Sequence, residues 1–174
     1  MSAVENKKLV QDAFAAWTNG DGMAFFNLLA DNASWTVMGN CPISGTYVGR
    51  DQLVENALKP QRAKLAGPPT PTVINLIAEE DTVVIQWMGK GTTKTGQPYN
   101  NSYCYVVQIE NGKIIRGTAY LDTELVSPLN LVICSIEKQS GSSPTLFFSV
   151  PGLGCHLATH VVLKDRVAAD LARP

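Results

Sequence analysis

The chain has 174 residues, enough for one domain with an appendage and too few for two full domains. Charged residues make up 17% of it and the net charge is -1, so no positive field exists to hold a nucleic-acid backbone. Its apolar runs are far shorter than the roughly 20 residues that cross a bilayer, and Met1 to Glu5 lack the regions of a signal peptide. We expect a cytoplasmic protein that binds neither nucleic acid nor membrane.

Helical patterns dominate the first part of the chain. Ser2 and Glu5 form a capping box, and apolar residues then recur at helical spacing up to about Thr18. Asp21 is suited to cap a short second helix, in which apolar residues again share one side. A third amphipathic segment follows and reaches Pro60, which is expected to disturb its end. The sequence therefore predicts three helices.

After residue 70 the hydrophobic period changes to two, which is typical of strands. Strands are predicted over Ala33–Met38, Thr72–Ala78, Thr82–Met88, Ser102–Ile109 and Ile114–Leu121. Asn111-Gly112, between the last two, is the strongest short hairpin signal. Helices followed by a meander predict the α+β class, with three helices packed on one face of a curved antiparallel sheet.

The character of the chain changes near residue 127, so we expect one domain over residues 1–127 and a C-terminal extension over residues 128–174. The extension has loop-like Ser, Gly and Pro clusters and a helical pattern over Ala158–Ala172. Cys155, His156 and His160 have spacing that suits a metal, but no carboxylate accompanies them. We expect neither a metal site nor a cofactor.

Four short motifs, in order, carry a resemblance that covers about residues 4–126. They are Ala15-Ala16-Trp17 with Gly20-Asp21, Leu29 to Ala33 with Trp35, Ser44-Gly45-Thr46-Tyr47 with Gly49-Arg50, and Asn111-Gly112-Lys113-Ile114 through Ala119 to Thr123. With these motifs the chain resembles the SnoaL-like branch of the nuclear-transport-factor-2-like superfamily, which includes ketosteroid isomerases, polyketide cyclases and epoxide hydrolases. The resemblance implies a cone-shaped fold with a deep apolar pocket, in a homodimer.

Function has to be argued from the site, because this fold hosts many chemistries. Ketosteroid isomerases of the family use a tyrosine, a carboxylate base and a protonated acid, and these positions align with Ala13, Val37 (or Thr36) and Cys104. The water-activating aspartate of the epoxide hydrolases aligns with Ala119. None of these side chains replaces a carboxylate or a strong donor, so neither chemistry is expected.

Strand parity predicts which residues face the pocket. With Ala119 inside, the expected lining is Ala13, Phe14, Trp17, Trp35, Val37, Asn56, Ser102, Cys104, Val106, Ile115, Gly117, Ala119 and Leu121. Further polar candidates near the pocket mouth are Asn40, Cys41, Tyr47 and Asp122. The outer face of the sheet is expected to carry Tyr103, Tyr105, Arg116 and Tyr120 and to form much of a homodimer contact. Such a row of aromatics needs a cover, either a second copy or the C-terminal extension folded over it.

Two functions remain open. The first is an isomerase, cyclase or dehydratase that works on a small molecule by shape and a few polar groups. The second is a non-catalytic pocket protein or a dimeric interaction module. The lack of titratable groups in the expected lining favours the second function, and the family framework favours the first. In both, the partner in the pocket is expected to be a small, neutral, apolar ligand.

Overall fold

The computed structural model describes residues 1–127, 132–137 and 145–149. The chain divides into two compact units, Met1–Asn130 and Leu131–Pro174. The second unit contains an antiparallel hairpin of β7 (Val132–Glu137) and β8 (Thr145–Ser149). The predicted helix over Ala158–Ala172 and the residues Cys155, His156 and His160 lie outside the described residues.

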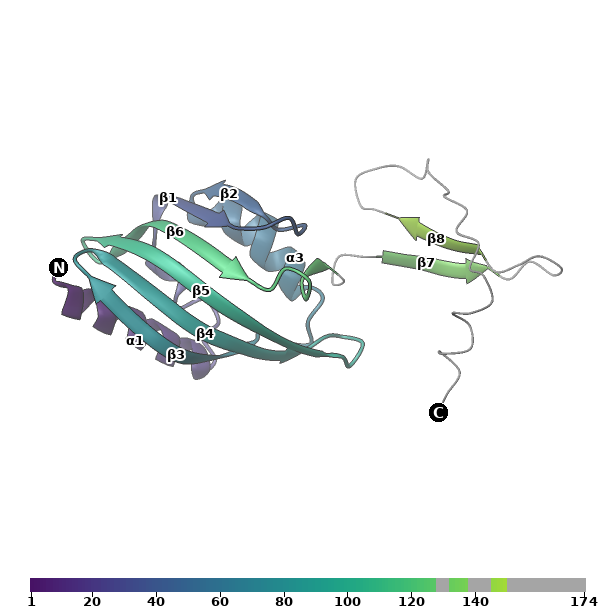
Figure 1. The fold of residues 1–174 in the computed structure, drawn as a ribbon, viewed down its shortest axis with the longest axis horizontal. Helices are drawn as coiled ribbons and strands as arrows, with labels where there is room; N and C mark the ends of the chain where they lie inside the picture. Colours follow the sequence, from purple (N-terminus) through teal and green to yellow (C-terminus); the bar gives the residue numbers. More distant parts are fainter. Residues whose placement is uncertain (128–131, 138–144, 150–174) are drawn as a thin grey trace. The chain divides into compact units, whose positions relative to one another are not determined.

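The first unit is an α+β domain with a six-stranded sheet, as expected (Figure 1). Its helical segments are α1 (Ala3–Thr18), η1 (Phe26–Leu28), α2 (Arg50–Leu53), η2 (Val54–Leu58) and α3 (Lys59–Arg62). Its strands are β1 (Leu29–Val37), β2 (Gly45–Val48), β3 (Thr70–Glu79), β4 (Thr82–Thr92), β5 (Pro98–Glu110) and β6 (Lys113–Leu121). They lie in the order β2-β1-β6-β5-β4-β3. Figure 1 shows the helices on one face of this sheet.

The sheet is mixed, which corrects the prediction of a purely antiparallel one. β3 to β6 form the expected antiparallel meander. β1, however, pairs with β6 in parallel, and β2 adds an antiparallel edge strand that the sequence pattern did not indicate. A parallel pair joins segments far apart in the chain, so no local turn signal announces it.

The predicted first helix is confirmed, and the prediction of a second helix is wrong. The Ser2 hydroxyl accepts the Glu5 backbone N–H, and the Glu5 carboxylate accepts the Ser2 N–H, so the capping box is formed. Asp21 caps the Met23 N–H at 3.0 Å, but only the short 3-10 turn η1 follows. Leu29, expected at the end of that helix, is the first residue of β1, where it pairs with Ile114 and is buried. Sheet pairing overrides the local helical pattern here.

The third helix continues through Pro60 to Arg62 instead of ending before it. A proline inside a helix lacks one N–H donor and crowds the carbonyl four residues earlier. The π-helical turn η2 lies directly before Pro60 and widens the backbone where that crowding falls. The segment from Arg50 to Arg62 therefore carries its side chains on an irregular helix.

A bulge in β6 decides which side chains face the core. Beside the turn, Ile109 pairs with Ile114, as a two-residue hairpin requires. The next pair joins Gln108 to Arg116, so Ile115 has no partner on β5 and every later pair is displaced by one residue. The turn itself is as predicted, with Asn111 and Gly112 both at positive φ.

This displacement reverses the predicted faces of β5, because a shift of one residue exchanges the two sides of a strand. Tyr103 and Tyr105, expected outside, pair with Leu121 and Ala119 and are buried in the core. Cys104, expected in the pocket, pairs with exposed Tyr120. The expectation that Tyr103 and Tyr105 form a dimer surface is therefore wrong.

The core lies between the helical segments and the inner face of the sheet. Its largest fully buried side chains are Trp35, Trp87, Tyr99, Phe14, Phe25 and Phe26. Alternate residues of β4, Val83, Ile85 and Trp87, face it. Within the part of the chain that the structure describes, no helix is long and apolar enough to span a membrane.

Candidate functional site

Two small cavities adjoin each other inside the domain, between the inner face of the sheet and the helical segments. They share a wall made of Phe26, Leu58, Gln61, Tyr103 and Tyr105. Each has a volume of about 30 Å³, which is room for about one or two water molecules. The structure thus contains small cavities in the place where a deep pocket was expected.

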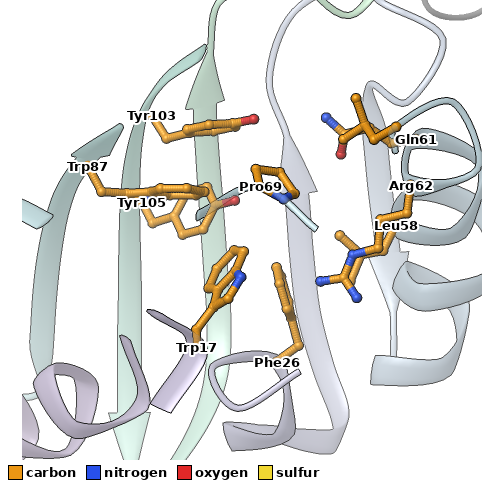
Figure 2. A pocket seen from close by; sticks show the side chains of 10 residues that line it. Trp17, Phe26, Leu58, Gln61, Arg62, Pro69, Trp87, Tyr103 and Tyr105 are labelled. Carbon is orange, nitrogen blue, oxygen red and sulfur yellow. The ribbon is translucent and has the colours of Figure 1, made fainter. Parts of the chain in front are cut away.

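The first cavity, drawn in Figure 2, has one wall of flat aromatic rings. The rings of Trp87 and Tyr103 are stacked, with centroids 4.0 Å apart and planes 9° apart. The ring centroids of Trp17 and Trp87 lie 5.1 Å apart. Tyr105 meets Trp87 edge to face, with ring centroids 5.3 Å apart. Stacked and edge-to-face rings hold one another in place, so this wall is rigid.

The opposite wall comes from the irregular helix and is polar. Figure 2 shows the Gln61 and Arg62 side chains facing the aromatic rings across the cavity. The half-buried guanidinium of Arg62 donates to the Gly22 carbonyl at 2.7 Å and contacts the Met23 sulfur at 3.2 Å. Burial lowers the pKa of Arg62, yet an arginine remains charged in any protein.

A hydrogen-bond network joins the two walls. The Tyr99 hydroxyl accepts a bond from Gln61 at 2.6 Å and one from Asn101 at 3.3 Å, and lies 3.0 Å from the Tyr103 hydroxyl. Asn101 is fully buried and is fixed by two bonds with the backbone of Asp122, at 3.0 and 3.1 Å. The Tyr99 and Tyr103 hydroxyls are thus hydrogen-bonded to each other, and Gln61 and Asn101 hold Tyr99 in place.

The two phenols beside the cavities are donors, not bases. Burial, with the nearby Tyr99 as a second cause, raises the pKa of both Tyr103 and Tyr105. Both hydroxyls therefore keep their protons near neutral pH. Among the described residues, the lining of the two cavities includes no carboxylate, imidazole or thiol. The polar side chains of the described lining therefore offer hydrogen bonds but no group that accepts a proton near neutral pH.

Five of the predicted pocket residues line the cavities: Trp17, Trp35, Val37, Ala119 and Leu121. Three others lie in the buried domain interior without lining a cavity: Ala13 and Phe14 in the core, and Gly117, whose missing side chain leaves room for the Trp35 ring. The π-helical turn leaves Asn56 exposed, so its prediction is wrong.

Because of the bulge in β6, the remaining predicted pocket residues do not face the core. Ser102 is exposed, and Cys104 and Val106 are half-buried on the alternate positions of β5 that do not face the core. At the bulge, Ile114 is fully buried in place of the predicted Ile115. Tyr103 and Tyr105, which share one face of β5, were the residues that sequence reasoning assigned to the wrong side.

The polar candidates at the expected pocket mouth do not line either cavity. Asn40 and Asp122 are exposed. Cys41 is buried, with its sulfur 3.3 Å from the Ser44 hydroxyl, and the Tyr47 hydroxyl donates to the Ile43 carbonyl at 2.8 Å. The polar atoms of Cys41 and Tyr47 thus contact residues that are close to them in the chain. Across the described ranges, no three His, Cys, Asp or Glu side chains lie together as metal ligands.

The lining residues that sequence reasoning did not place in the pocket include Trp87, Phe26, Leu58, Gln61, Arg62, Tyr103 and Tyr105. Gln61 and Arg62 follow Pro60, where the helix was expected to be disturbed. Because the helix continues, both side chains reach the cavity (Figure 2). No short motif marks them in the sequence.

Comparisons with known proteins bear on the fold. The SnoaL-like domain family matches residues 10–117, more than half of the chain. An NTF2-like protein of Burkholderia thailandensis is 28% identical, with 71% of this chain and 95% of that chain covered at a TM-score of 0.61. Among curated proteins, none matches the chain.

Two further solved structures are similar at lower identity. TerC, co-crystallized with polyporic acid, is 20% identical and has a TM-score of 0.60, with 71% of this chain and 96% of TerC covered. A protein of Catenulispora acidiphila with a ketosteroid isomerase-like fold, solved in complex with trimethylamine, is 20% identical with a TM-score of 0.54. That likeness covers 68% of this chain and 88% of the other.

Proposed function

The chain belongs to the SnoaL-like domain family, and from this membership we propose that the domain binds a small, flat, largely apolar molecule between its sheet and its irregular helix. The observation that carries the proposal is the rigid wall of Trp17, Trp87, Tyr103 and Tyr105 facing Gln61 and Arg62 across a cavity. Flat rings with a few convergent polar groups are typical of small-molecule sites. Two structures of the same fold contain a small molecule, polyporic acid in one and trimethylamine in the other.

Binding requires the cavities to widen. Sites for drug-sized ligands typically have volumes of about 300–1,000 Å³, against about 30 Å³ for each cavity here. Leu58 and Gln61 line both cavities and belong to the segment with the π-helical turn. Such turns are frequent at functional sites. We propose that this segment moves outward when the ligand enters, and that the two cavities then join.

Binding without proton abstraction is the function that the lining supports best. In the described lining, the two phenols, the amide and the guanidinium are donors near neutral pH. Proton abstraction needs a group that accepts a proton in that range. An isomerase-type reaction is the second candidate, favoured by the same donors, since hydrogen-bond donors placed at a developing enolate oxygen stabilise it.

The test is a titration with benzamide, a flat and neutral probe, followed by NMR of the tryptophan indole N–H groups. Trp17 and Trp87 line the first cavity, so their resonances are expected to move saturably. Leu58→Ala removes part of the shared wall and is expected to tighten binding, whereas Leu58→Trp fills the cavities and is expected to abolish it.

Val54→Ala is the matched control, because Val54 belongs to the same turn but lines neither cavity. It is expected to leave benzamide binding unchanged. Indole resonances that do not move in any of these proteins would contradict the proposal. So would equal binding by wild type and Leu58→Trp.

A further inference from the structure

Arg62 brings a positive charge to the cavity without a countercharge. Its guanidinium is half-buried, and its contacts are the Gly22 carbonyl, the Met23 sulfur and the Phe26 ring, whose centroid lies 5.9 Å away. The three ion pairs of the described residues, Lys8–Asp12, Arg50–Asp51 and Lys59–Glu55, do not involve it. A guanidinium has five N–H donors. Part of its donor capacity is thus unused, and Figure 2 shows the guanidinium on the cavity wall opposite the aromatic rings.

A charge in this position costs free energy unless it is paired. Withdrawing an ionised group from water is unfavourable, and a carbonyl and a thioether compensate only part of the loss. Burial accordingly lowers the pKa of Arg62. An anion beside the guanidinium would offset the cost through charge-assisted hydrogen bonds, which are about twice as strong as neutral ones.

Other donors around the same cavity also lack partners. The indole N–H groups of Trp17 and Trp87 are buried, and neither has a hydrogen-bond partner among the described residues. Figure 2 shows the Trp17 nitrogen on the edge of the ring that faces Phe26 and Arg62. The Tyr105 hydroxyl, drawn pointing into the same space, forms no hydrogen bond within the described part of the chain. Buried donors normally have hydrogen-bond partners, so the Trp17 indole N–H, which faces the same space as Arg62, is suited to an acceptor bound there.

We propose that the cavity beside Arg62 is a subsite for an ionised oxygen, so that the ligand is a flat organic anion with a carboxylate or enolate group. The inference rests on the proposed function, since it assigns the chemistry of the molecule bound in that site. The oxygen takes the free N–H groups of Arg62 and the Trp17 indole N–H, and the ring of the ligand lies against the aromatic wall. This proposal differs from the expectation based on the sequence, which was a neutral ligand.

Benzoate and benzamide are matched probes, because they have the same shape and differ in charge. The wild-type protein is expected to bind benzoate at least about tenfold more tightly than benzamide. Arg62→Met keeps an apolar stem of similar length and removes the charge. It is expected to lower the affinity for benzoate by about tenfold or more and to leave that for benzamide within about threefold.

Three further variants complete the design. Arg62→Lys keeps the charge and is expected to keep a preference for benzoate, which supports the proposal even where the methionine variant is unstable. Arg50→Met removes an arginine at the other end of the same helical segment, outside the cavity lining, and is expected to change neither affinity. Trp17→Phe removes one N–H donor and is expected to weaken benzoate binding by roughly tenfold.

The outcomes separate the two proposals. Equal affinity for benzoate and benzamide in the wild type, unchanged in Arg62→Met and Arg62→Lys, would overturn the anion subsite and leave the ligand site standing. Binding of neither probe by any of these proteins would overturn both. A loss of both affinities in Arg62→Met, with benzoate and benzamide equal in Arg62→Lys, would also overturn the anion subsite, because the arginine would then act through packing alone.

Discussion

Gly117 of β6 lies opposite Trp35 of the parallel strand β1, and the indole ring occupies the space of the side chain that glycine lacks. A Cβ atom at position 117 would lie 2.1 Å from Cε3 and 2.3 Å from Cζ3 of Trp35. No real Cβ contact is that short, so one residue must move if position 117 carries a side chain. Trp35 also lines the second cavity, so this pair supports both the core and the candidate site.

Gly117→Ala is expected to destabilise the domain. Overpacking a well-packed core typically costs about 1–3 kcal/mol, and the added methyl here meets the ring of a buried tryptophan. Urea unfolding followed by tryptophan fluorescence measures the change. Gly67→Ala is the control, since a Cβ at Gly67 meets no atom within 4 Å. Equal stability of Gly117→Ala and Gly67→Ala would show that Trp35 moves aside freely.

Asp81 is expected to make stability depend on pH in the acid range. Its carboxylate accepts hydrogen bonds from Gln108 at 2.7 Å and from Thr82 at 3.0 Å, and these lower its pKa below the ordinary value of 3.8. A lowered pKa in the folded state gives a stabilisation that is complete above pH 3.8 and is lost as the pH falls below it.

Asp81→Asn removes this titration. Its melting temperature is expected to fall less steeply than that of the wild type below about pH 4, as thermal unfolding by circular dichroism would show. Glu79→Gln, which removes a neighbouring exposed carboxylate, serves as the control. Parallel curves for wild type and Asp81→Asn would contradict the prediction.

Residues 1–127 are expected to fold without the rest of the chain. The hydrophobic core of the described residues is built from side chains between Val10 and Val126, and the first compact unit ends at Asn130. A protein that ends at Ser127 should melt cooperatively and keep the helix and strand signal of these elements. Aggregation, or a broad transition, would place the C-terminal residues in the core.

The outer face of the sheet is expected to form a homodimer contact. Tyr120 is 47% exposed and Met88 36% exposed, and half-buried Cys104 and Val106 lie on neighbouring outward positions. An apolar sheet face of this kind commonly lies against a partner. Sedimentation of the full chain should report a dimer, which Tyr120→Lys weakens. Val4→Lys, on an exposed position of α1, should leave the dimer intact. A monomer at all concentrations would reject this contact.

Turnover of a Δ5-3-ketosteroid or of limonene oxide at enzyme-like rates is not expected. Val37 and Ala119, which align with acidic positions of the ketosteroid isomerases and epoxide hydrolases, line the second cavity. Ala13, which aligns with the isomerase tyrosine, is a buried core residue. Loss of one oxyanion donor typically costs about a hundredfold to a thousandfold in rate, and here base and donor positions are both changed. Product formation by chromatography, beside an active family enzyme as positive control, measures it. Robust turnover of either substrate would mean that another group performs the acid-base step.

The sequence alone determined those elements that are encoded by a few neighbouring residues. The capping box of Ser2 and Glu5 predicted the start of α1, because both partners lie within one helical turn. Asn111-Gly112 predicted the β5–β6 hairpin, since a tight turn needs two residues that tolerate positive φ. Trp35 and Val37 line the second cavity on the face that strand parity predicts, because this part of β1 keeps a regular alternation.

Only the tertiary structure decided which face of β5 forms the site. The bulge at Ile115 depends on hydrogen bonds between two strands, and nothing in either strand alone reveals it. One unpaired residue there moves Tyr103 and Tyr105 from the outer face to the cavity. The position of Arg62 was decided in the same way, because the helix continues through Pro60 after the π-helical turn η2, which no local signal in the sequence indicates.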